Sequence, residues 1–120
     1  MSIEDMEGKT FVKVEADRER DTLRFIEADG SYFEFYHCQD CCESVYIEDI
    51  NGDISDLEGE VLTMAQESTK NDTDGEYGES TTWTFYNFAT IKGYVNIRWI
   101  GSSNGYYSES VDLRRVENES

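Results

Sequence analysis

Proline is absent from this chain of 120 residues, and histidine occurs once, at His37. Without proline, one common marker of a linker between domains is missing, and a chain of this length is typical of one domain. No apolar run approaches the roughly 18 residues of a membrane span, and the acidic N-terminal segment lacks the apolar stretch of a signal peptide. We therefore expect a single domain over residues 1–120, located in the cytoplasm and not bound to a membrane.

Basic residues are scarce as well. Ten Lys and Arg stand against 27 Asp and Glu, so the formal net charge is −17 and the pI about 4.1. Between Phe25 and Thr69 there is no Lys or Arg at all, against 12 acids. Direct binding to nucleic acid is disfavoured, because phosphates need cations to neutralise them. Hydrophobic residues at 38% and aromatic residues at 13% are too many for a disordered acidic tail, so we expect a folded core.

Apolar and polar residues alternate along most of the chain, which predicts β-strands. Asp29-Gly30 between two alternating runs predicts a tight hairpin, because glycine accepts a positive φ. We expect a mainly β fold, a single small antiparallel β-sandwich or barrel-like domain of about eight strands, with at most one short helix in residues 55–60. The expected strands cover residues 11–15, 22–26, 32–36, 44–50, 61–67, 81–88, 93–100 and 106–116.

Three segments are expected to lie outside this framework. Residues 68–80 are polar and contain two glycines, which favours a mobile loop. Residues 1–8 and 116–120 are expected to fray, as chain ends commonly do.

Residues 37–43 (HCQDCCE) contain the only histidine and all three cysteines. Cys38 and Cys41 have C-x-x-C spacing, but a closed zinc site takes its other two ligands from a second segment, and the chain has no such pair. A metal shared between two copies stays open. A reactive thiol is disfavoured because Asp40 and Glu43 oppose thiolate formation. We expect no cofactor, and one or two of the cysteines buried as small hydrophobic residues in a reducing compartment.

Two further acidic patterns carry little specificity. Residues 49–60 resemble a calcium-binding loop in part, but Ile54 stands where the loop requires its glycine. Paired carboxylates for glycoside hydrolysis could be nominated almost anywhere in so acidic a chain.

Aromatic and hydroxyl side chains are concentrated in residues 81–86 and 104–108. Tyr and Trp provide large, rigid contacts with a polar tip, so the strand faces that do not pack the core are suited to recognition. We expect the binding site to join these residues with the segment from His37 to Asp49. The candidate binding residues are His37, Asp40, Cys41, Cys42, Glu43, Tyr46, Glu48, Asp49, Trp83, Tyr86, Arg98, Asn104, Tyr106 and Tyr107.

The same motifs resemble a family of small bacteriophage and prophage proteins. The resemblance covers most of residues 9–113, and its strongest parts are residues 37–50 (HCQDCCESVYIEDI), 82–86 (TWTFY), 91–99 (IKGYVNIRW) and 103–111 (SNGYYSESV). No established activity comes with this resemblance. It implies a viral origin and a role inside the bacterial host, where small acidic phage proteins often antagonise host enzymes or defence systems.

Three classes of function remain. The favoured class is a non-catalytic acidic protein that inhibits or modulates a host bacterial protein with a basic surface, by imitating the charge of nucleic acid. The second is a protein that sequesters a small nucleotide signal, with aromatic rings on the base and cations such as Arg98 on the phosphate. The third is a small enzyme that uses His37. A virion structural role and a homo-oligomer stay open.

Overall fold

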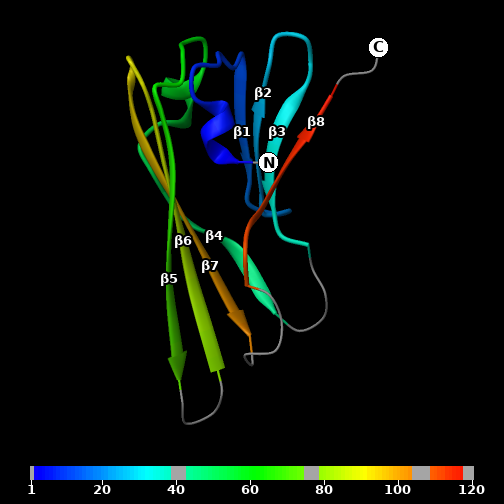
Figure 1. Ribbon diagram of the computed structural model, residues 1–120, viewed down its shortest axis with the longest axis vertical. Helices are drawn as coiled ribbons and strands as arrows, with labels where there is room; N and C mark the ends of the chain where they lie inside the picture. Colours follow the sequence, from blue (N-terminus) through cyan, green and yellow to red (C-terminus); the bar gives the residue numbers. More distant parts are fainter. Residues whose placement is uncertain (1, 39–42, 75–78, 104–108, 118–120) are drawn as a thin grey trace.

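The computed structural model describes residues 2–38, 43–74, 79–103 and 109–117. Within these residues, eight strands form two four-stranded antiparallel sheets. The first sheet has the order β1 (Lys13–Asp17), β2 (Thr22–Ile26), β3 (Tyr32–Tyr36) and β8 (Asp112–Val116). The second has the order β4 (Ser44–Asn51), β7 (Gly93–Ser103), β6 (Glu79–Thr90) and β5 (Met64–Asp74). The sheets pack face to face, which confirms the expected antiparallel β-sandwich (Figure 1).

An aromatic core packs between the two sheets. Phe25 and Phe35 from the first sheet meet Tyr86 and Phe88 from the second, with ring centroids 4.8 Å apart for Phe25 and Phe88 and 4.7 Å for Phe35 and Tyr86. All four side chains are buried, and so is Trp99 on β7. Because successive strand residues face opposite sides, this inward set accounts for the period of two in the sequence.

The β2–β3 hairpin forms where the sequence predicts it. Gly30 has a φ of +91°, which glycine adopts without strain, and the Asp29 carboxylate accepts a hydrogen bond of 2.8 Å from the Ser31 backbone N–H.

The polar segment 68–80, expected as a loop, is mostly strand. β5 continues to Asp74 and β6 begins at Glu79, so the hairpin they form projects beyond the first sheet; residues 75–78 lie outside the description (Figure 1). Polar pairs across the strands replace apolar packing here, for example Asn71 Nδ2 donating to Thr82 Oγ1 at 2.7 Å. The expectation of a loop was wrong because alternation of apolar residues cannot mark a strand that is polar on both faces.

The N-terminal segment, expected to fray, is ordered as the 3-10 helix η1 (Ile3–Met6). Ile3 and Met6 are buried against the core, and Ser2 caps the helix. The helical turn expected in residues 55–60 is the 3-10 helix η2 (Ile54–Leu57), capped by Asp53. Of the C-terminal residues expected to fray, Val116 still ends β8 and residues 118–120 lie outside the description. Neither helix is long and apolar enough to cross a membrane, and no other helix occurs in the described ranges.

Candidate functional site

The structure distributes the candidate residues over three places. His37 and Glu43 lie at the end of the sandwich where β3 ends and β4 begins. Tyr86 is 1% exposed in the core, so its side chain is not part of a binding surface. A third group lies on the second sheet: Tyr46, Glu48, Asp49, Trp83 and Arg98. The remaining candidates, Asp40, Cys41, Cys42, Asn104, Tyr106 and Tyr107, lie outside the described residues.

His37 connects the end of β3 with the segments before β4 and β8. Its Nδ1 lies 2.7 Å from the backbone oxygen of Ser110, and its Nε2 lies 3.4 Å from Glu43 Oε1. A carbonyl oxygen only accepts a hydrogen bond, so Nδ1 of His37 is the donor to Ser110. With side chains 5% and 0% exposed, this pair joins three segments and is shielded from solvent.

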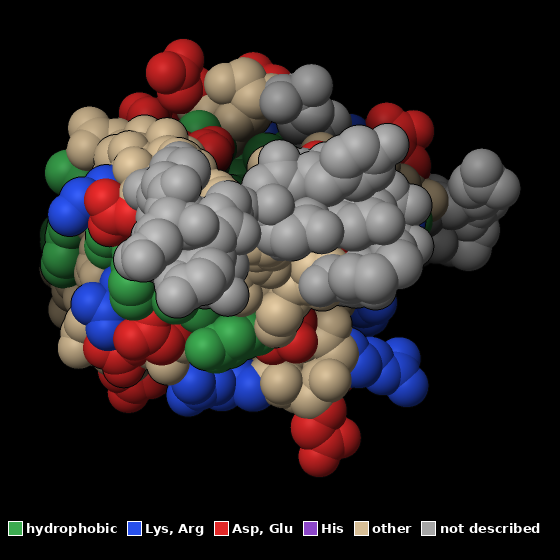
Figure 2. All heavy atoms as spheres, turned by 90° about the horizontal axis from the view of Figure 1, so that it is seen from below, with side chains coloured by type: hydrophobic (Ala, Val, Ile, Leu, Met, Phe, Trp, Pro, Cys, Tyr) green, Lys and Arg blue, Asp and Glu red, His purple; other side chains and the backbone are tan. Residues whose placement is uncertain are grey.

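The segment that begins at His37 therefore lies beside Ser110, close in the chain to the aromatic segment 104–108. His37 and Ser110 are 73 residues apart in the sequence, and β4 and β6 both pair with β7 at this end. Acidic and basic side chains surround this end of the molecule (Figure 2). Cys38, next to His37, is a free thiol and is exposed rather than buried.

Glu109 lies near the same end, and the sequence analysis missed it. The residue is 8% exposed, and its carboxylate accepts hydrogen bonds from the hydroxyls of Ser80 at 3.1 Å, Thr82 at 2.8 Å and Ser103. Three donors from β6 and β7 replace the water that the carboxylate loses on burial. Nothing in the sequence distinguishes this glutamate from the other acids, because its partners come from distant strands.

The outer face of the second sheet carries an aromatic hollow. Arg98 on β7 lies over the Trp83 ring on β6, 5.5 Å from its centroid, and its Nη2 donates to Glu48 Oε1 at 3.0 Å. A β-bulge between Ile47 and Asp49 sets this register on β4. The hollow has a volume of about 300 Å³ and is lined by Lys70, Asp72, Trp83, Phe85 and Arg98.

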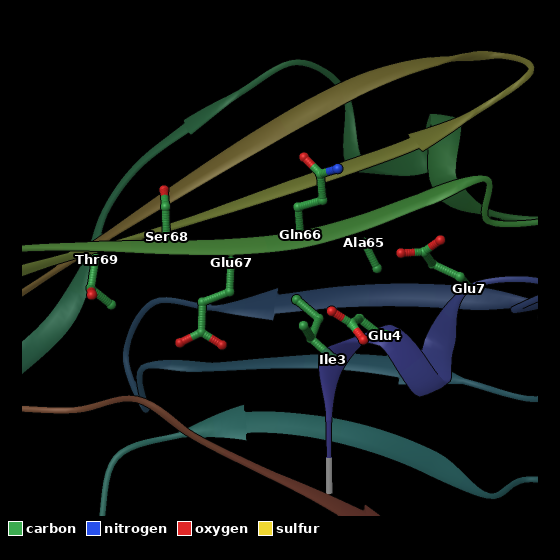
Figure 3. Close-up of a pocket in the computed structure, with 8 residues that line it drawn as sticks. All are labelled: Ile3, Glu4, Glu7, Ala65, Gln66, Glu67, Ser68 and Thr69. Atoms are coloured by element: carbon green, nitrogen blue, oxygen red, sulfur yellow. The ribbon is translucent and has the colours of Figure 1, made fainter.

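A larger hollow of about 510 Å³ lies between η1 and β5. Ala65, Glu67 and Thr69 extend from β5 toward η1, whereas Gln66 and Ser68 extend to the other side of the strand (Figure 3). Burial raises the pKa of Glu67. The sequence analysis missed this hollow because residues 1–8 were expected to fray and residues 68–80 to form a loop, so no wall was expected opposite the strand predicted for residues 61–67.

Glu4 of η1 and Glu7, the C-cap of η1, line this hollow together with Glu67, and no Lys or Arg is among its lining residues. In the part of the chain that is described, no three His, Cys, Asp or Glu side chains gather as a metal site would require. The hollow is therefore an acidic groove beside a strand.

Most basic side chains are engaged within the protein. Among the described residues, Arg18 donates to the backbone oxygens of Ile47 and Glu48, and Lys92 donates to the backbone oxygen of Glu58. Seven others form ion pairs with carboxylates: Lys9, Lys13, Arg20, Arg24, Arg98, Arg114 and Arg115. Many carboxylates remain exposed at the surface, among them those of Glu4, Asp5, Glu7, Asp17, Glu19, Asp29, Asp53, Glu67, Asp72 and Glu117.

The fold and these surfaces define a small antiparallel β-sandwich with a strongly acidic exterior. The chain matches the family described as "Domain of unknown function (DUF7448)" over residues 4–113, from η1 to the start of β8, and it belongs to that family. No curated protein and no solved structure matches the chain.

Proposed function

We propose that this chain is a non-catalytic acidic protein that binds a basic surface of another protein. In this proposal it is encoded by a phage and inhibits or modulates a protein of the bacterial host in the cytoplasm, in the manner of a nucleic-acid mimic. The observation that carries the proposal is how the cations are used: most of the described basic side chains are held by carboxylates or backbone oxygens, while a large excess of carboxylates faces solvent.

This arrangement favours fast, salt-dependent association with a basic protein surface. A formal charge of −17 on a 13.9 kDa domain produces a negative potential that attracts basic surfaces and repels nucleic acid. Exposed charges separated by more than the Debye length, about 10 Å at 0.1 M salt, are largely screened. Affinity for the partner should therefore fall steeply as salt is raised.

The test begins with the tagged protein on a biosensor surface. Proteins captured from a bacterial lysate at low salt are identified by mass spectrometry, purified, and titrated at about 50 mM and about 500 mM salt. We expect a partner with a basic surface whose Kd rises more than about tenfold between the two conditions. A Kd that does not change with salt contradicts the proposal.

A second function is favoured by the hollow on the second sheet. Trp83 and Phe85 offer aromatic faces, and two cations line the hollow beside them: Lys70, and Arg98, which also pairs with Glu48; Asp72 is the one acidic lining residue. This combination is suited to a nucleotide, with a ring for the base and cations for phosphate. Thermal unfolding with and without a panel of nucleotides tests it, because a ligand that binds only the folded state raises the Tm. The Trp83→Ala variant should lose that shift, and a panel with no shift excludes the nucleotide function.

A further inference from the structure

The two sheets end in four edge strands, and most of these edges are protected. On β4, Arg18 Nη2 donates to the backbone oxygens of Ile47 and Glu48 at 3.2 and 2.7 Å, and the Ile47 N–H donates to Asp21 Oδ1 at 3.3 Å. On β1, the Val14 N–H donates to Glu58 Oε2 at 2.8 Å. β8 is only five residues long. Occupied backbone groups, a bulge and short length are common means of preventing an edge from pairing with another chain.

The edge of β5 is different. The N-terminal segment closes the edge just before the strand, where the Gly8 N–H donates to the Leu62 oxygen and the Leu62 N–H donates to the Lys9 oxygen, each at 2.8 Å. Beyond this point, no hydrogen bond from another described segment reaches the backbone of residues 64–70 on the side away from β6. In an edge strand, alternate N–H and C=O groups point away from the sheet. β5 therefore offers a row of backbone donors and acceptors.

The acidic groove lies along this same stretch. Its lining includes Ala65 to Thr69 of β5 and, opposite them, Ile3, Glu4 and Glu7. A strand added beside β5 would direct every second side chain toward the groove, because strand side chains alternate between faces. Three carboxylates there, with no cation among the lining residues, match Lys or Arg at those positions.

We infer that the free edge of β5 binds an extended basic segment of a partner protein by strand addition. The backbone of the added segment pairs with residues 64–70, and its alternate Lys or Arg side chains face Glu4, Glu7 and Glu67. This inference rests on the proposed function and names the surface and the mode of binding.

The probe is a fluorescein-labelled ten-residue peptide of alternating lysine and threonine, measured by fluorescence anisotropy at low salt. We expect saturable binding and, by NMR, slower exchange of the β5 backbone amides in the complex. Two further peptides carry N-methyl groups on the lysine amides or on the threonine amides. At least one of them should bind more than about tenfold more weakly, because methylation removes the donors along one edge of the added strand.

Charge-matched variants test the groove. The triple variant Glu4→Gln, Glu7→Gln, Glu67→Gln should weaken peptide binding by roughly tenfold. The control variant Glu19→Gln, Glu60→Gln, Glu117→Gln makes the same change in net charge at residues that do not line the groove and should lower the affinity by less than about threefold.

The outcomes separate the two proposals. Equal losses in both triple variants, or equal binding of all three peptides, overturn the edge site while leaving an acidic binding protein in place. Protection of the β5 amides that depends on protein concentration without peptide shows a second copy at the edge and also overturns it. If the peptide binds at the β5 edge but no host protein with a basic surface is found, the edge site stands and the proposed function fails.

Discussion

Glu34 provides a sharp test of how this acidic protein uses its arginines. It lies in the centre of the first sheet, is 1% exposed, and stands opposite Arg24 on β2 and Arg114 on β8. Arg24 Nε donates to Oε2 at 2.5 Å and Arg114 Nε donates to Oε1 at 2.8 Å. The hydrogen bond with Glu34 raises the pKa of Arg24. The Glu34→Gln variant keeps the size of the side chain and removes its charge.

The expected loss of stability depends on how far Glu34 and its two arginine partners are buried. Breaking a fully buried ion pair costs about 3–5 kcal/mol, because the remaining charge is left without a partner. Here the Arg24 and Arg114 side chains are 39% and 51% exposed, so water solvates them after the change. We therefore expect Glu34→Gln to lower the free energy of unfolding by about 2–3 kcal/mol and the Tm by roughly 10 °C.

Urea unfolding followed by tryptophan fluorescence measures this loss. The matched control is Glu15→Gln, whose carboxylate pairs with Lys13 at 3.0 Å while both side chains are well exposed, at 43% and 61%. The control should lose less than about 1 kcal/mol. If both variants unfold at the same urea concentration with the same m-value, the buried network contributes nothing and the reasoning is refuted.

Three further predictions concern single positions. Gly52→Ala should lower the free energy of unfolding by about 3 kcal/mol, since φ is +106° and the new Cβ would lie 2.6 Å from the Tyr94 oxygen; Gly8→Ala, at φ +87° with open space, should lose only about 1 kcal/mol in the same urea assay. Glu109→Gln should lower the free energy of unfolding by about 1–2 kcal/mol, because the new amide nitrogen is a donor and would face a hydroxyl that donates to the carboxylate in the wild type. An unchanged midpoint of chemical unfolding would show that the three hydroxyls are equally well satisfied without the charge. Hydrogen bonds from Ser55 lower the pKa of Asp53 below 3.8, so its stabilising contribution is full above that pH and is lost as the pH falls through the folded value. Asp53→Asn keeps a helix cap without titrating, so its Tm should fall less than that of the wild type between about pH 5 and pH 2, and parallel curves would contradict this.

The strands of the core were predictable because their inward faces are apolar. β2 and β3 have the bounds that alternation predicts, since Leu23, Phe25, Phe33 and Phe35 all face the second sheet. The β5–β6 hairpin was not predictable in the same way, because beyond the core its strands are held by polar pairs across the sheet. The ordered N-terminus was missed for a related reason: two buried residues, Ile3 and Met6, are too few to form a pattern.

For the candidate surfaces, the sequence predicted which residue types are present better than it predicted which side chains face outward. It identified Trp83, Arg98 and Glu48 as candidates, and the structure places them in direct contact on one sheet face. It also nominated Tyr86, which the pairing of β6 turns into the core. A shift of one residue in register moves every side chain of a strand to the opposite face of the sheet. Because β6 has aromatic residues on both faces, only its pairing with the neighbouring strands decides which of them point into the core.

The amino-acid sequence by itself determined the net charge, the β class and the local turn at Gly30, because these depend on composition and on residues close together in the chain. Only the tertiary structure decided which carboxylates are buried and which sheet edge is free. The partners of Glu34 are 10 and 80 residues away, and the contact of His37 with Ser110 spans 73 residues. The β5 edge is free over residues 64–70 because no other described segment reaches its backbone there, and such an arrangement exists only once both sheets have packed together.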